Sequence, residues 1–84
     1  MDVLIRYITA QKVEIDIHQM TRDQAKRYLE QFLNRVNGNV REVAVIHGCH
    51  QGTVLQQMVR TGLKHKRIKG KVQTLNQGVT ILIL

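Results

Sequence analysis

An apolar run that leads straight into a glycine-containing turn constrains the fold more than any other stretch. Residues 43–46 read Val-Ala-Val-Ile without a polar interruption, and a turn that contains Gly48 and Gly52 follows. Such a run is typical of a strand buried on both faces, as in the centre of a mostly parallel sheet. Apolar residues at helical spacing then predict a helix over residues 52–63. The stretch therefore predicts a β–turn–α unit with polar groups at the carboxyl edge of a sheet.

The segment before this unit predicts another strand and a long helix. Residues 13–18 alternate apolar and polar side chains, as in a strand with one face on the core. Thr21 and Gln24 have the spacing of a capping box, and a single apolar stripe follows them. We expect this helix to end at residues 37–39, with Gly38 in a left-handed cap. The stripe consists of Ala25, Tyr28, Leu29, Phe32, Leu33 and Val36.

The last third of the chain predicts a hairpin after a basic run. Residues 72–75 and 79–84 have strand composition, and an Asn-Gln-Gly turn separates them, so the two strands should be antiparallel. The expected order is β-α-β-α-β-β, which is an α/β two-layer sandwich with a mixed sheet and two helices. Residues 13–84 would form this domain, and residues 1–12 an N-terminal arm or an extra strand.

The charge of the chain is high and unevenly distributed. Residues 1–42 hold seven basic and six acidic side chains, whereas residues 43–84 hold six basic side chains and no acidic one. The asymmetry suggests an anionic partner, most simply nucleic acid, although a solubilising excess of charge would look the same. One cysteine and the lack of a signal peptide or a membrane span favour a cytoplasmic protein.

Two histidines follow the ends of the two predicted parallel strands. Because both carboxyl ends lie at one sheet edge, His18 and His47 could converge on one crevice, and Asp16 could orient the ring of His18. Gly48 and Gly52 allow close approach of a ligand, and turn N–H groups favour a phosphate. One histidine could act as general base and the other as general acid, while these amides stabilise the phosphate. Together they would suffice for metal-independent phosphodiester cleavage, without a cofactor.

Simpler interpretations stay open for each of these features. Either histidine could be a surface or capping residue, and the glycines could serve turn geometry alone. The cations of the basic run could follow a nucleic-acid backbone or only solvate a sheet edge. A metal site at the second histidine turn would have an unusual spacing, and Cys49 lacks an orienting triad as a nucleophile. The basic side chains in question are Lys64, Lys66, Arg67 and Lys69.

Two of the motifs resemble the hallmarks of the Smr domain, the small MutS-related domain. Asp16, His18 and a threonine shortly after them match an L-D-x-H-G-type segment at a strand end, with Gln19 in place of the usual glycine. His47 and Gly48 match an H-G-x-G-type turn that enters a helix. In this turn the run to the helix is one residue longer, and a histidine stands where the next glycine is expected. Motifs in this order are a fairly specific signal.

A third motif completes the resemblance. Residues 78–81, Gly-Val-Thr-Ile, are similar to the closing G-x-T-x strand of the family, so the resemblance covers about residues 13–84. It implies a fold like the C-terminal domain of bacterial translation initiation factor three, and nucleic-acid binding. Many members nick DNA or cleave RNA, some of them messenger RNA at stalled ribosomes. Site residues carried over by the motifs are Asp16, His18, His47 and Gly48.

The resemblance leaves two main functional hypotheses. The first is an endonuclease that acts on RNA or DNA, and the second is a non-catalytic module that binds nucleic acid or the ribosome. Gln19 and His50 replace glycines that would give a phosphate room, although His50 could instead add a hydrogen-bond donor. A protein–protein adaptor is a third hypothesis. Only three aromatic residues are present, which favours backbone recognition over base stacking.

Overall fold

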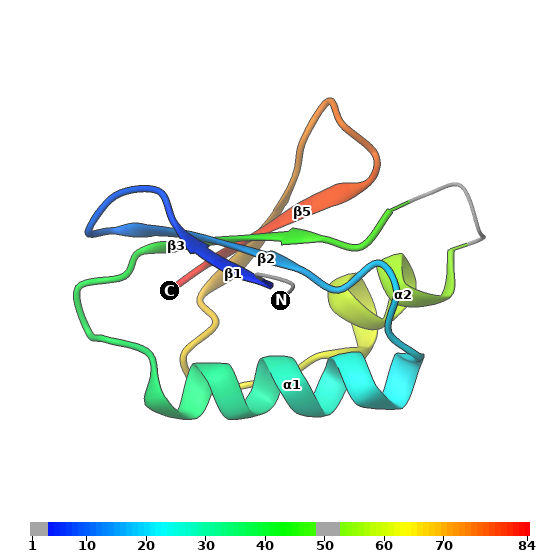
Figure 1. The fold of residues 1–84 in the computed structure, drawn as a ribbon, viewed down its shortest axis with the longest axis horizontal. Helices are drawn as coiled ribbons and strands as arrows, with labels where there is room; N and C mark the ends of the chain where they lie inside the picture. Colours follow the sequence, from blue (N-terminus) through cyan, green and yellow to red (C-terminus); the bar gives the residue numbers. More distant parts are fainter. Residues whose placement is uncertain (1–3, 49–52) are drawn as a thin grey trace.

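A five-stranded mixed sheet forms one layer of the computed structural model, which describes residues 4–48 and 53–84 (Figure 1). Its strands lie in the order β1-β2-β3-β5-β4. β2 and β3 are parallel, and the other three neighbouring pairs are antiparallel. The strands are β1 Ile5–Tyr7, β2 Lys12–Asp16, β3 Glu42–Ile46, β4 Gly70–Gln73 and β5 Val79–Ile83. The expected mixed sheet is confirmed.

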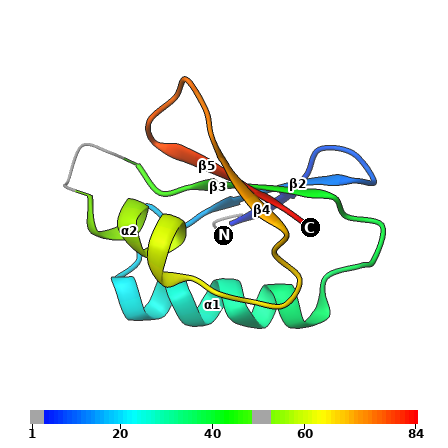
Figure 2. The same cartoon turned by 180° about the vertical axis from the view of Figure 1, so that it is seen from behind.

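The helices cover one face of the sheet, as both views show (Figures 1 and 2). They are α1 Arg22–Arg35, the short α2 Val54–Gln57, and the π-helical turn η1 Met58–Gly62 that continues it. We call the covered face the inner face of the sheet and the other one its outer face. The expected two-layer α/β sandwich is therefore confirmed. No helix among residues 4–48 and 53–84 has the length and apolar character needed to cross a membrane.

Helix α1 forms as its sequence predicts, except at its end. Thr21 accepts a hydrogen bond from the Gln24 amide at 3.2 Å, and the Gln24 side chain bonds back to the Thr21 amide at 3.1 Å. The predicted left-handed cap at Gly38 is wrong, because among the described residues only Gly48 has a positive φ. The helix ends earlier, at the extended residue Val36, whose carbonyl accepts a hydrogen bond from the Arg67 side chain.

Residues 5–7 form an additional edge strand. β1 pairs antiparallel with β2, so Ile5 lies opposite Ile15. The Thr9 hydroxyl closes the connecting turn by accepting from the amides of Gln11 and Lys12, both at 3.1 Å. Residues 1–12 were expected to form an arm or an extra strand, and within this segment residues 5–7 are a strand.

The second predicted helix is α-helical only at its start. After α2 the chain widens into η1, where the Leu63 amide donates to the Met58 carbonyl five residues back, at 2.6 Å. A lysine from β4 explains where the turn stops, because Lys71 Nζ donates to the carbonyls of Arg60 and Leu63 at 3.2 and 2.6 Å. The helical periodicity of the sequence cannot predict this tertiary contact.

Strand β3 lies at the centre of the sheet, as its apolar run predicts. Val43 and Val45 are fully buried against the helices, and Ala44 on the outer face is only 6% exposed. No helix covers Ala44, but its cross-strand neighbours Glu14 and Ile81 carry larger side chains that shield it. The sheet around β3 is mixed, since only β2 runs parallel to it.

The final hairpin differs from its predicted bounds by two residues. β4 begins at Gly70 and ends at Gln73, whereas residues 72–75 were expected to be extended. The chain turns earlier because the Thr74 hydroxyl accepts from the Asn76 amide and donates to the Asn76 carbonyl, at 3.1 and 2.8 Å. The predicted antiparallel pairing with β5 is confirmed.

Candidate active site at one sheet edge

Three of the sequence motifs meet at one edge of the sheet. β2 and β3 both end there, with Asp16 opposite Ile46, and β5 starts there, with Val79 opposite Ile46. The two parallel strands deliver their following residues to this edge, as expected for a β-α-β unit. The motif residues that gather there are Asp16, His18, His47, Gly48, Gly78 and Thr80.

Asp16 and His18 form a hydrogen-bonded pair. The Nδ1 atom of His18 bonds to Oδ1 of Asp16, and the His18 amide donates to the same oxygen at 3.1 Å. The side chains remain 48% and 36% exposed for His18 and Asp16 respectively. A carboxylate can only accept, so it holds the proton of a neutral ring on Nδ1 and leaves the lone pair on Nε2. No described residue hydrogen-bonds to Nε2, so in the neutral ring this nitrogen is available to accept a proton.

His47 has different surroundings, because its ring is buried and both of its nitrogens are engaged. It is only 3% exposed, its Nδ1–H donates to the Gly48 carbonyl at 3.0 Å, and its Nε2 accepts from the Thr80 hydroxyl at 2.9 Å. Burial lowers the pKa of His47; the Gly48 carbonyl opposes this effect, and the nearby Arg60 charge adds to it. The ring is thus held neutral and in one tautomer.

Arg60 extends this network from the helix layer. Its Nε–H donates to the Thr80 hydroxyl at 3.0 Å, so that hydroxyl accepts from Arg60 while it donates to His47. Thr80 is fully buried, and a buried hydroxyl without partners would be costly. The sequence shows Thr80 as the one polar residue of an apolar strand, and this was the signal that could have identified its role.

The two imidazoles are at the same edge but on different faces of the sheet. His18 pairs with Asp16, which points to the outer face because its neighbour Ile15 is in the core. His47 contacts Thr80, which points to the inner face and η1. Among the described residues the two rings share no hydrogen-bond partner. The structure thus gives the predicted pairing of Asp16 with His18, and separate surroundings for His47.

Gly48 directly follows His47 and lies beside His18, and its backbone conformation favours glycine at this position. Its φ is +76°, and a Cβ there would lie 3.4 Å from Cβ of His18. The amides of Gly48 and His47 both donate to the Gly78 carbonyl, at 3.0 and 2.9 Å. These two amides are therefore occupied within the protein and do not form a phosphate cradle. The rest of the predicted turn, with Cys49, His50 and Gly52, lies outside the described residues.

Residues 65–67 of the basic run lie at the other end of α1. His65 bonds to the side chain of Asn34 at 2.7 Å, and Arg67 donates to the Val36 carbonyl at 3.0 Å, both at the C-terminal end of that helix. His18, by contrast, lies shortly before the N-terminal end of α1. One N–H group of Arg67 is thus already hydrogen-bonded within the fold. The remaining cations of the run, Lys64, Lys66 and Lys69, are exposed.

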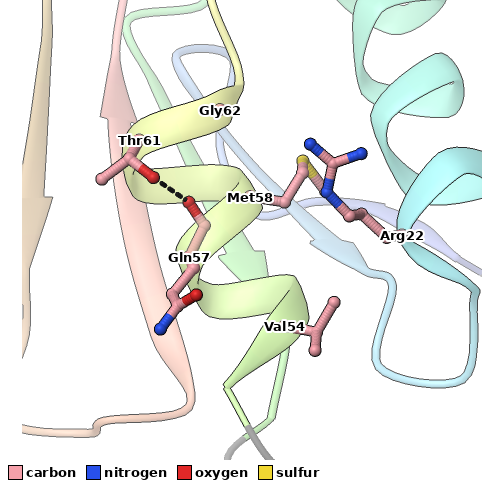
Figure 3. Close-up of a pocket in the computed structure, with 6 residues that line it drawn as sticks. All are labelled: Arg22, Val54, Gln57, Met58, Thr61 and Gly62. Atoms are coloured by element: carbon pink, nitrogen blue, oxygen red, sulfur yellow. Dashed lines mark hydrogen bonds between the residues drawn. The ribbon is translucent and has the colours of Figure 1, made fainter.

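A shallow hollow lies between α2–η1 and the first turn of α1 (Figure 3). The Met58 side chain, 2% exposed, is part of its lining, and the Thr61 hydroxyl is turned back onto the Gln57 carbonyl at 2.7 Å. None of the three histidines in the described part of the chain lines it. Within residues 4–48 and 53–84, no group of three or more side chains suited to hold a metal ion is present. The lining residues are Arg22, Val54, Gln57, Met58, Thr61 and Gly62.

Comparison with known proteins assigns the chain to a family. No curated protein and no solved structure matches it significantly. The family model described as the Smr domain matches residues 15–83, a range that includes the Asp16–His18 pair, the His47–Gly48 turn and Thr80. Since the match covers most of the 84 residues, the chain belongs to the Smr domain family.

Proposed function

We propose that this Smr domain binds nucleic acid and cleaves its phosphodiester backbone as an endonuclease, with RNA or DNA as substrate. Family membership and the basic second half of the chain support nucleic-acid binding. The observation that carries cleavage is the pairing of Asp16 with the exposed ring of His18 at the sheet edge. A cytoplasmic location is part of the proposal, because the one cysteine suits a reducing compartment.

His18 acts as the general base in this proposal. Its Nε2 takes the proton from the attacking oxygen, which belongs either to water or to a ribose 2′-hydroxyl. The new bond to phosphorus replaces the bond to the leaving ester oxygen, which takes up a proton from solvent. Asp16 keeps the proton on Nδ1, holds the ring in place and stabilises the imidazolium that forms. Phosphate charge would be balanced by cations of the second half, since the amides of His47 and Gly48 already bond to Gly78.

His47 has a positioning role in this proposal, rather than that of the acid or base which the sequence alone suggests. Acting as an acid, a ring with a lowered pKa would be short of protons at neutral pH. Its two hydrogen bonds instead join the turn at Gly48 to β5 and hold the edge together beside His18. His47 thus supports the geometry of the Asp16–His18 pair.

Cleavage of labelled single- and double-stranded RNA and DNA, with and without a chelator, tests the proposal. His18→Asn should lower the cleavage rate by about 100- to 10,000-fold, the usual contribution of a general base. Binding measured by mobility shift should be nearly unchanged, because a general base acts on the chemical step. His65→Asn is the matched control, because that ring bonds to Asn34 at the far end of α1. Equal cleavage by wild type and His18→Asn would refute the assignment.

A non-catalytic binding module, for nucleic acid or the ribosome, is the second candidate. One observation favours it: two of the turn amides that could stabilise a phosphate are occupied by the Gly78 carbonyl. This alternative predicts that the wild type retards oligonucleotides but leaves them intact under every condition of the same assay. Cleavage that depends on His18 excludes it.

A further inference from the structure

Three cations outside the Asp16–His18 pair lie together where η1 meets β4. Arg60 belongs to η1, Lys64 follows the end of that turn, and Lys71 is in β4. We call these three residues the η1–β4 strip. Lys71 Nζ donates to the Arg60 and Leu63 carbonyls, so the ammonium group lies beside the residue that precedes Lys64.

Arg60 is held in a way that suits phosphate binding. Its Nε–H is fixed on the Thr80 hydroxyl at 3.0 Å, and within the described residues no carboxylate pairs with it and no acceptor takes its two Nη groups. A guanidinium has five N–H donors in a planar fork. Four of them belong to the Nη groups, which makes Arg60 an oriented donor for two phosphate oxygens.

The strip gathers positive charge that no acidic residue in its half of the chain balances. Residues 43–84 contain no Asp or Glu. Burial lowers the pKa of Lys71, and repulsion by the charge of Lys64 lowers it further. A bound anion would relieve this repulsion.

A continuous series of contacts joins the strip to the candidate active site. Arg60 bonds to Thr80, Thr80 bonds to His47, and His47 bonds to the Gly48 carbonyl. Gly48 in turn lies against the side chain of His18. A nucleic-acid strand held at Arg60 is therefore close to the edge at which the proposed general base lies.

We propose that the η1–β4 strip is the binding site for phosphates of the nucleic-acid backbone. Arg60 binds one phosphate through both Nη groups, and Lys64 and Lys71 attract the phosphates that follow. The strand then passes Gly48 to reach His18. This inference rests on the proposed nucleic-acid binding and adds to it the residues that hold the backbone. The strip makes direct contacts with phosphates, whereas Lys66 and Lys69 contribute only long-range attraction.

Two double variants with the same loss of charge test the strip. Arg60→Gln with Lys64→Gln removes two of its cations, and Lys66→Gln with Lys69→Gln removes two exposed cations of the neighbouring loop. Anisotropy of a labelled single-stranded RNA, titrated at several NaCl concentrations, gives affinity and salt dependence. The strip variant should bind at least tenfold more weakly, with a salt slope reduced by about 1.4, because each phosphate contact contributes about 0.7. The loop variant should lose less than half as much slope.

The outcomes separate this inference from the proposed function. Equal losses in the two double variants, or a larger loss in the loop variant, would overturn the strip while nucleic-acid binding stands. If the wild type binds no RNA at low salt, nucleic-acid binding itself is wrong, and the strip with it. Lys64→Gln alone leaves the Arg60–Thr80 bond intact, so its smaller loss of slope, about 0.7, keeps the test valid if changing Arg60 impairs folding.

Discussion

The hydroxyl group of Thr80 lies 2.9 Å from Nε2 of His47 and donates its proton to that nitrogen. The same oxygen accepts from Nε of Arg60 at 3.0 Å, so one fully buried hydroxyl satisfies a ring of the turn and a guanidinium of η1. This hydroxyl therefore joins the sheet edge to the helix layer through two hydrogen bonds. Two predictions concern this junction directly.

Replacing Thr80 by valine should destabilise the fold. Valine has nearly the same shape but cannot bond to His47 or Arg60, and a buried polar group left unsatisfied costs about 1–3 kcal/mol. Urea unfolding followed by circular dichroism measures the loss. Thr80→Ser keeps the hydroxyl and serves as the control, with a smaller loss. A valine variant as stable as the wild type would show that the two bonds contribute nothing net.

The stability of the protein should fall as the pH drops below about 6.5, the usual pKa of histidine. Because the pKa of His47 is lowered in the fold, the unfolded chain binds the proton more tightly there. The contribution is therefore fully present above the unfolded pKa and is lost as the pH falls from that value toward the folded one. Unfolding free energies between pH 5 and 8, about the range in which histidine titrates, measure the effect.

A His47→Asn variant provides the comparison for this pH dependence. The other three histidines are the same in both proteins, so the difference between the two pH profiles isolates His47. The profile of the variant should be flatter through the acidic limb. Parallel profiles would mean that His47 takes up its proton as readily in the fold as in the unfolded chain.

Much of this architecture could be predicted because local patterns and burial act together. The stripe and capping box of α1, and the apolar run of β3, specify their elements without help from distant residues. The pairing of Asp16 with His18 could also be predicted, since residues two apart in a strand lie on the same face. Such features depend on neighbours in the sequence.

Features that depend on distant contacts could not be predicted. The π-helical turn ends where Lys71, eight residues beyond Leu63, takes its carbonyl. Whether His47 is a reacting or a positioning group depends on Thr80, thirty-three residues away, and on the burial of the ring. Likewise, the sequence does not show where the cations of the basic run lie relative to the histidines, whereas the bond from Arg67 to Val36 places part of the run at the far end of α1.

Replacing Lys71 by methionine should destabilise η1. The long apolar stem is kept, but the two carbonyls of Arg60 and Leu63 lose a charged donor, and such bonds contribute about 1.5–3 kcal/mol each when well desolvated. Because Lys71 is only partly buried, we expect the lower end of that range for both together. Amide hydrogen exchange at Leu63 measures the local opening. Lys69→Met is the control, since it removes an exposed lysine in the same segment; similar exchange in both variants would contradict the role of Lys71.

Alanine at Gly48 should reduce both stability and cleavage, whereas alanine at Gly38 should not. At Gly48 the left-handed backbone costs an alanine about 1–2 kcal/mol, whereas the new Cβ would only be in van der Waals contact with Cβ of His18, at 3.4 Å. Relaxation of the strained backbone would shift this turn and the His18 that contacts it relative to Asp16, so the cleavage rate should fall by more than the folded fraction does. Gly38 has open space around it and no positive φ, so alanine there should be neutral or stabilising by about 0.4–1 kcal/mol. Thermal unfolding and the cleavage assay, run on both variants, measure these effects. A Gly48→Ala variant that cleaves at the wild-type rate would mean that the spacing between this turn and His18 does not matter to the reaction.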